Sequence, residues 1–151
     1  MRAVVTRVKS ASVEIGGEIR GKIGQGYLVI LGVGPQDSEA EAAALAEKIV
    51  NLRVFEDEQG KMNLNISQVQ GEILAISQFT LYADLSSRRP GFSHAAPPSL
   101  AEPLYEFFLG RLAELGFPPQ HGEFGADMQV ASVNDGPVTL LLDTETMGKK
   151  K

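Results

Sequence analysis

The stretch Asn134-Asp135-Gly136-Pro137-Val138-Thr139 lies between two runs that alternate like β-strands, residues 128–133 and 138–143. An Asp-Gly pair between two such runs is typical of a hairpin turn. Pro137, however, has no N–H to donate to a neighbouring strand, and the Gly136–Pro137 bond is the one in this region most readily cis. The stretch therefore predicts a rigid tip with backbone carbonyls in fixed directions, either as a plain surface turn or as part of a site.

Length and composition bound the architecture. The chain has 151 residues, 43% of them hydrophobic, which is enough for one domain with a sizeable core. We expect the domain to span residues 1–146 and the basic segment 147–151 to be a disordered tail. No apolar run reaches the roughly 18 residues of a membrane span, and the first residues begin a strand pattern where a signal peptide would be charged and then apolar. A cytoplasmic protein with no membrane partner is expected.

Charge and residue types exclude several kinds of site. The formal net charge of −5 argues against broad binding along phosphate backbones, although it allows contact with the end of a nucleic acid. Without cysteine, the chain has no disulfide, thiol nucleophile or thiolate metal site. His94 and His121 are far apart, no carboxylate spacing indicates a metal, and residues 21–26 lack the spacing of a phosphate loop. We expect neither a metal nor a cofactor.

The first half of the chain predicts antiparallel strands and then a helix. Strands are expected at residues 2–8, 12–15, 18–23, 27–33 and 53–56, with Gly16-Gly17 as a hairpin turn. The nearly continuous apolar run at 27–33 indicates a central strand buried on both faces. Ser38 and Glu41 have the form of a capping box, so a helix is expected to begin there. Arg7 falls inside the first strand, where an arginine usually faces solvent.

The second half predicts a strand at 72–79, which brings Ser77, Gln78 and Thr80 to its carboxyl end. Residues 62–70 and 82–98 are expected to be loops, the second unusually long. A second helix ends near Leu115 and begins either at Pro98 or with a Ser99–Glu102 capping box. Strands at 120–124, 128–133 and 138–143 close the chain. This order predicts a single α+β domain with a strongly bent or barrel-like, mostly antiparallel sheet covered by two helices.

Few side chains offer conventional catalysis. Ser77 and Thr80 are the hydroxyls best placed for nucleophilic attack, but neither has a histidine near it in sequence to act as a base. Both could equally satisfy backbone groups at the end of a strand. Arg88 and Arg89, next to Phe92, could hold a phosphate and stack a base.

Two stretches carry a family resemblance. Ser77-Gln78-Phe79-Thr80-Leu81 and Asn134–Thr139 closely resemble the two signature stretches of the D-aminoacyl-tRNA deacylase family of bacteria and eukaryotes. The same family is also resembled by residues 1–15, 24–33, 89–90 with Phe92, and 124–126 with Met128, so the likeness covers nearly the whole chain. Residues 85–89 depart from it, because the family usually has a Lys-Gly pair before the arginine and one more residue nearby.

The resemblance implies hydrolysis of the ester that joins a D-amino acid to the terminal adenosine of tRNA, and of glycine wrongly attached to tRNA. It also implies a homodimer in which a cis Gly136–Pro137 tip enters the partner's active site. The tip would point two carbonyls at the substrate's α-amino group and leave no room for an L side chain. Arg7 would brace the tip, and the pocket for amino acid and adenosine would be lined by Ala101, Phe124 and Met128.

The resemblance further implies that no protein side chain attacks the ester. The ribose 2′-hydroxyl of the terminal adenosine would assist cleavage, and backbone N–H groups around Phe79 and Thr80 would stabilise the oxyanion. Ser77, Gln78 and Thr80 would hold that backbone in place. Alternatives are Thr80 as the nucleophile, a tRNA-binding module without catalysis, and an esterase that pairs Thr80 or Ser77 with His94.

Overall fold

The computed structural model describes residues 1–147, so the expected disordered tail at 147–151 lies outside the described residues except for Met147. Within residues 1–147, neither helix is long and apolar enough to cross a membrane. The elements follow in this order: β1 (Arg2–Ile15), β2 (Glu18–Ile23), β3 (Gly26–Gly32), α1 (Glu39–Asn51), β4 (Phe55–Glu56), β5 (Met62–Leu64), β6 (Glu72–Ser77), the 3-10 turn η1 (Phe79–Tyr82), α2 (Pro98–Glu114), β7 (Gln120–His121) and β8 (Gln129–Asp143).

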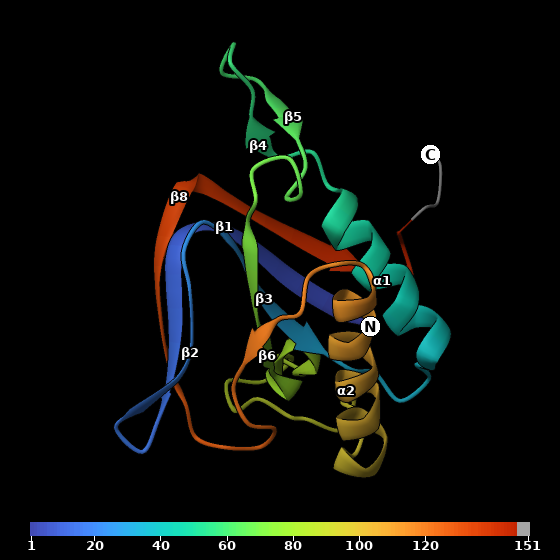
Figure 1. The fold of residues 1–151 in the computed structure, drawn as a ribbon. Coiled ribbons are helices and arrows are strands. Elements are labelled where there is room, and N and C mark those ends of the chain that lie inside the picture. The colour runs from blue at the N-terminus through green and yellow to red at the C-terminus, as the bar shows by residue number, and fades with distance from the viewer. Residues whose placement is uncertain (148–151) are drawn as a thin grey trace.

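Strand β1 organises the sheet, because three other strands pair with it. β8 runs antiparallel along one edge of β1, while the other edge is shared by β3 over residues 2–8 and β2 over residues 11–15. β6 pairs in parallel with β3, and β7 pairs in parallel with β6. β2 curls back toward β7, where Gly21 packs against Gln120 and His121, so the sheet is nearly closed (Figure 1). The predicted α+β fold with a barrel-like sheet is confirmed.

The central part of the sheet is buried on both faces by two separate cores. Helices α1 and α2 cover one face (Figure 1) and pack there on Tyr27, Val29 and Leu31 of β3. The second core fills the inside of the barrel and consists of Val8, Ala11, Val13, Ile23, Leu28, Leu74 and Ile76. Since neighbouring residues of a strand point to opposite faces, a strand between two cores must be apolar throughout. The prediction of a buried central strand at 27–33 is confirmed, with β3 between β1 and β6.

The two helices begin in different ways. At α1 the predicted capping box is present: the Ser38 hydroxyl accepts a hydrogen bond from the Ala40 N–H at 3.3 Å, and the Glu41 carboxylate accepts one from the Ser38 N–H at 2.9 Å. For α2 the sequence allowed two starting points. In the structure Pro98 is the first helical residue, and no side chain caps this end of the helix. Proline suits that position because its missing N–H would have no partner in the helix.

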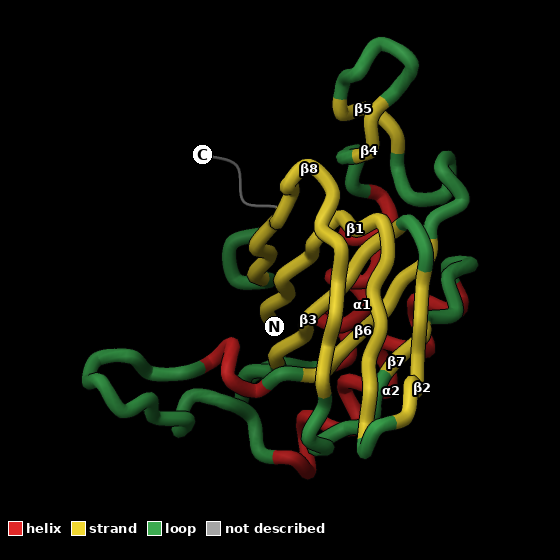
Figure 2. Tube along the Cα trace, turned by 90° about the vertical axis from the view of Figure 1, so that its left-hand side faces the viewer, coloured by secondary structure: helices red, strands yellow, loops and turns green. Residues whose placement is uncertain are grey.

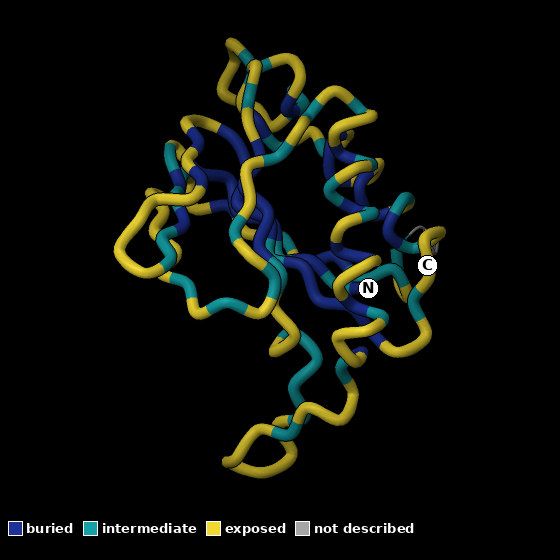
Figure 3. The backbone as a smooth tube through the Cα atoms, turned by 60° about the horizontal axis from the view of Figure 1, so that its bottom comes forward, coloured by how far each residue is buried: buried dark blue, intermediate teal, exposed yellow. Residues whose placement is uncertain are grey.

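Several strand predictions were wrong in detail. Residues 62–70 are not all loop, because β5 pairs with β4 in a small antiparallel hairpin. The strands expected at 2–8 and 12–15 are one strand, and the strand expected at 120–124 is only β7. Figure 2 shows the β4–β5 hairpin and the loop of residues 83–97 projecting from the sheet, and in Figure 3 that loop is largely exposed.

The largest error concerns the stretch 134–139. Residues 128–133 and 138–143 do not form a hairpin with each other. They belong to the single strand β8, and both halves pair with β1. The Asp-Gly pair wrongly predicted a hairpin because β1 is long enough to pair with both halves of β8, before and after the tip.

Candidate active site

A cavity of about 610 Å³ opens at the carboxyl end of β6. Ligand pockets usually measure about 300–1,000 Å³, so its size suits a small molecule or the end of a larger one. Six residues predicted for the site border it: Ser77, Gln78, Phe79, Ala101, Phe124 and Met128. They come from three regions of the chain, namely the β6–η1 junction, the first turn of α2 and the segment between β7 and β8.

The end of β6 is fixed against β3. Ser77 pairs with Leu31, and the Gln78 N–H donates to the Leu31 carbonyl at 2.7 Å before the chain turns into η1. A Cβ on Gly32 would stand 2.8 Å from Leu81 Cβ, so only glycine lets the turn pack this closely. The buried Tyr105 hydroxyl of α2 donates to the Ala75 carbonyl of β6 at 3.0 Å, and burial raises the pKa of Tyr105. Tyr105 therefore stays neutral and ties α2 to β6.

The N–H groups of Phe79 and Thr80 have no protein acceptor within residues 1–147. They stand in the first turn of η1, where helical N–H groups lack a partner inside the helix. The Gln78 side-chain amide donates to the Thr80 hydroxyl at 2.8 Å, which links the two residues on either side of Phe79. Unpaired backbone amides beside a cavity can stabilise a developing oxyanion.

The structure brings no histidine to Ser77 or Thr80 among the described residues. His94 lies in the exposed loop, with its Nε2 3.7 Å from Asp84 Oδ2. The Ser86 N–H donates to Asp84 and holds the pKa of that carboxyl below its usual range, and His94 adds a smaller effect. A Ser–His or Thr–His pair is therefore not assembled.

Arg7, Gly136 and Pro137 form a second group on β1 and β8. Val8 pairs with Asn134 and Thr6 pairs with Thr139, so residues 135–138 bulge out of β8 opposite Arg7. We call this bulge the tip. Its Gly136–Pro137 peptide bond is cis, and both residues are exposed.

Arg7 is buried beneath the tip, with only 4% of the residue exposed. Its Nε donates to the Asp135 carbonyl at 3.2 Å and lies 3.4 Å from Asp135 Oδ2. Its Nη1 donates to the Val54 carbonyl at 2.6 Å. The alternative that Arg7 faces solvent is therefore wrong.

Within one chain the tip and the cavity are far apart. Val130 borders the cavity, whereas Gly136 lies further along the same strand. At about 3.3 Å per residue, the segment 130–136 spans about 20 Å. The residues predicted for one site thus fall into two groups, one at the cavity and one at the tip.

Some residues at the cavity were not predicted for the pocket. Phe92, from the exposed loop, packs edge-on against Phe79 with 4.9 Å between ring centroids, and both rings are partly exposed. In the sequence, Phe92 stood out through its neighbours Arg88 and Arg89 and through the family resemblance, but it was not assigned to the pocket. Pro97 and Val130 carried no sequence signal for a pocket, because their place at the cavity depends on how α2 and β8 pack.

Comparison with known proteins gives consistent matches. The family model described as D-Tyr-tRNA(Tyr) deacylase matches residues 4–143. Relatives named D-aminoacyl-tRNA deacylase include one from Roseiflexus sp. (strain RS-1), 58% identical over 95% of this chain and 94% of the relative, and one from Symbiobacterium thermophilum, 56% identical over 96% and 97%.

Solved structures agree on the fold. A structure titled c-Myc DNA Unwinding Element Binding Protein has a TM-score of 0.90 and 46% identity over 95% of this chain and 98% of the other. A structure titled as a probable eukaryotic D-amino acid tRNA deacylase has a TM-score of 0.81 over 93% and 97%, and at 13% identity it bears on the fold alone.

These matches place the protein among the hydrolases. The chain belongs to the D-aminoacyl-tRNA deacylase family, as the two signature stretches predicted.

The geometry of Arg7 gives a stability prediction. Arg7→Lys should lower the free energy of unfolding by about 1–3 kcal/mol, because one ammonium group cannot reach both carbonyls that the guanidinium serves and a buried acceptor is left unpaired. Urea unfolding measures the change. The control is Arg20→Lys, because Arg20 is exposed and lies 4.0 Å from Glu18, so its change should stay within about 0.5 kcal/mol. Equal midpoints for the two variants would contradict the bracing role of Arg7.

Proposed function

We propose that this protein hydrolyses the ester bond between a D-amino acid and the terminal adenosine of tRNA in the cytoplasm, and also removes glycine wrongly attached to tRNA. The products are free tRNA and the amino acid. The observation that carries the proposal is the pair of unpaired N–H groups at Phe79 and Thr80 beside a cavity of suitable volume. The relatives' name, D-aminoacyl-tRNA deacylase, gives the substrate class.

The chemistry rests on the backbone of η1. Water adds to the ester carbonyl carbon with help from the ribose 2′-hydroxyl, and the N–H groups of Phe79 and Thr80 stabilise the resulting oxyanion. The carbon–oxygen bond to the ribose then breaks, and the leaving oxygen takes up a proton. Ser77, Gln78 and Thr80 keep the two amides in place, which the hydrogen bond from Gln78 to Thr80 supports.

The cavity would hold the aminoacylated adenosine. Ala101, Phe124 and Met128 supply apolar lining for the amino acid and the adenosine. Phe79 and Phe92 present exposed ring surface at the same cavity, and aromatic rings are the usual platforms for unstacked bases. One chain therefore offers binding surface for both the ester and the base.

Selection for the D configuration comes from the tip of a second copy of the chain. Gly136 and Pro137 are exposed, and up to about 20 Å of strand separates them from Val130 at the cavity of their own chain. β8 also exposes apolar side chains, with Val133 55% and Leu141 77% exposed, as a strand covered by a partner would. In a two-fold homodimer each tip enters the partner's site, points its carbonyls at the α-amino group and blocks an L side chain.

Two alternatives have weaker support. A binding module without catalysis would leave the unpaired amides without a role, and the charge of −5 disfavours broad nucleic-acid binding. A Ser or Thr esterase needs a base, and His94 is instead beside Asp84.

The proposed activity predicts a chiral preference. The purified protein should cleave D-tyrosyl-tRNA on the order of a hundredfold faster than L-tyrosyl-tRNA, because steric exclusion acts only on the L substrate. Release of labelled tyrosine measures both rates. If neither substrate is cleaved, the protein is better explained as a tRNA-binding module without catalysis. Equal rates for the two substrates would indicate an unselective esterase.

The backbone mechanism predicts opposite effects for two changes at one residue. Phe79→Pro removes the N–H and should lower kcat by about 10²–10³-fold, whereas Phe79→Ala keeps the N–H and should lose far less. Proline fits this first helical position, because Gln78 before it is extended, with φ −147° and ψ 100°. Single-turnover rates on D-tyrosyl-tRNA give the comparison.

Thr80→Ala completes this test and should keep activity within about tenfold. A loss of about 10⁴-fold in a folded Thr80→Ala variant would make Thr80 a nucleophile. Normal turnover of a tRNA ending in 2′-deoxyadenosine would remove the ribose hydroxyl from the mechanism.

Assembly in trans predicts rescue between two defective chains. In Gly136→Ala, a Cβ would stand 2.9 Å from Val138 Cγ2 and 3.0 Å from Arg7 Nη2 at φ +124°, so the tip should distort and lose D-selective cleavage. Mixed with Phe79→Pro chains, each heterodimer should regain one of its two sites, since an intact tip then meets an intact η1. No rescue despite proven subunit exchange, or a fully active monomer in sedimentation, would show that the tip serves its own chain.

A further inference from the structure

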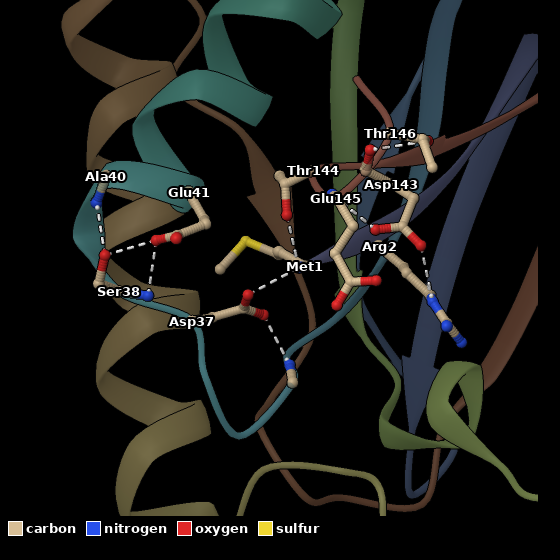
Figure 4. Close-up of polar contacts among 11 residues, drawn as sticks. Met1, Arg2, Asp37, Ser38, Ala40, Glu41, Asp143, Thr144, Glu145 and Thr146 are labelled. Carbon is tan, nitrogen blue, oxygen red and sulfur yellow. Dashed lines mark hydrogen bonds and ion pairs between the residues drawn. The ribbon is translucent and has the colours of Figure 1, made fainter. Parts of the chain in front are cut away.

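The far end of η1 is held by an arginine that the proposed mechanism does not use. Arg2, the first residue of β1, donates from Nη1 to the Leu81 carbonyl at 3.0 Å and from Nε to Asp143 Oδ2 at 3.1 Å. Its guanidinium carbon lies 4.3 Å from the centroid of the Tyr82 ring. Figure 4 shows the Arg2 side chain directed toward the Asp143 carboxylate. One side chain thus contacts the last two residues of η1 and the end of β8.

We propose that Arg2 is a positioning residue for the reaction: it fixes η1 so that the Phe79 and Thr80 amides keep their place beside the cavity. This inference rests on the proposed function, because it gives those amides a catalytic role. Arg2 touches neither the cavity lining nor the two amides, so it acts through Leu81 and Tyr82.

The turn needs an external support. η1 contains no buried residue and has no side-chain cap at its start. Its rear half, Leu81 and Tyr82, packs on the chain below. Leu81 lies over Gly32, and a Cβ added to Gly34 would stand only 3.1 Å from the Tyr82 ring. The front half, with Phe79 and Thr80, is exposed. The direction of the front amides therefore depends on how firmly the rear half is held.

Arginine is suited to this place in two ways. The last carbonyls of a helical turn lack partners inside the turn and carry partial negative charge, so a cation that donates to Leu81 stabilises that end. The planar guanidinium can also donate in two directions while stacking on an aromatic ring. Arg2 and Asp143 face each other in the register of β1 and β8, so Arg2 ties the turn to the paired ends of these two strands.

The sheet itself does not depend on this side chain. β1 keeps its backbone pairing with β3 and β8 over residues 2–6 whatever side chain stands at position 2. The Arg2–Asp143 pair is partly exposed, at 38% and 22%, and such pairs contribute little to stability. Loss of Arg2 should therefore lower catalysis without a matching loss of stability.

The test uses a double-mutant cycle in the full chain with D-tyrosyl-tRNA. Arg2→Met should lower kcat about tenfold and change KM less than about twofold, because misplaced amides weaken binding of the transition state more than of the substrate. Tyr82→Leu should lower kcat in the same direction, and the double variant should lose less than the sum of the two single losses. Arg2→Lys, which keeps the charge but has a single donor nitrogen, should recover part of the rate. Arg20→Met is the matched control and should match the wild type.

Hydrogen exchange provides a readout independent of activity. The amides of Gln78, Leu81 and Ala83 are hydrogen-bonded in the structure, and their exchange should quicken in Arg2→Met but not in Arg20→Met. Unchanged exchange and kcat in Arg2→Met, additive losses in the double variant, or a fall in kcat matched by a fall in melting temperature would each overturn the inference. A wild-type protein that cleaves neither tyrosyl-tRNA would instead overturn the proposed function, and exchange would still decide whether Arg2 holds the turn.

Discussion

The buried guanidinium of Arg7 is the interaction on which the tip depends. A buried charge must be paired and hydrogen-bonded, since an uncompensated one costs several kcal/mol. Arg7 meets this requirement with the Val54 carbonyl and with the carbonyl and carboxylate of Asp135, while the Glu56 carboxylate lies 4.0 Å away. Those partners come from the start of the β4–β5 hairpin and from the bulge in β8. One side chain therefore joins three parts of the chain at the middle of β1.

The position of Arg7 in β1 is where the partners of that strand change. β3 pairs with β1 up to Val8, β2 takes over from Ala11, and on the opposite edge β8 leaves and rejoins the register around residues 135–138. A long strand can bend where its pairing changes on both edges, and bulges increase the local twist. The curvature that nearly closes the sheet and the bulge that forms the tip thus arise at the same place.

Both groups of the proposed site are held by β1, at different points along it. Arg7 at its middle carries the tip, and Arg2 at its start supports the turn with the unpaired amides. Because these points lie apart on one strand, a single chain keeps tip and turn separate. In the proposed dimer, the middle of β1 in one protomer would position the tip, and the start of β1 in the partner would position the turn. The relative placement of tip and amides in each site would therefore depend on how stiff β1 is, and β1 has paired strands on both edges.

The sequence predicted those features that depend on local or periodic patterns. The capping box at Ser38, the doubly buried β3 and the polar end of β6 all follow from residues close together in the chain, and the family resemblance supplied the pocket residues Ala101, Phe124 and Met128. The hairpin predicted at Asp135-Gly136 failed because strand pairing is a long-range choice, made here by β1. The sequence also did not predict that Arg7 is buried or that Arg2 contacts Tyr82, because in both cases the partner residues are distant in sequence.

If the proposed backbone amides form the oxyanion site, the side chains that stand out in the sequence near the end of β6 are not the groups that carry the chemistry. Ser77 and Thr80 attract notice as nucleophiles because hydroxyls are visible in a sequence, yet no base meets them among the described residues. The groups that are free to donate are N–H groups, which every residue except proline supplies. What the sequence must encode is therefore the shape of η1, through the glycines beneath Leu81 and Tyr82 and the arginine behind them. Such a site would depend on residues that hold the turn from behind as well as on those that border the cavity.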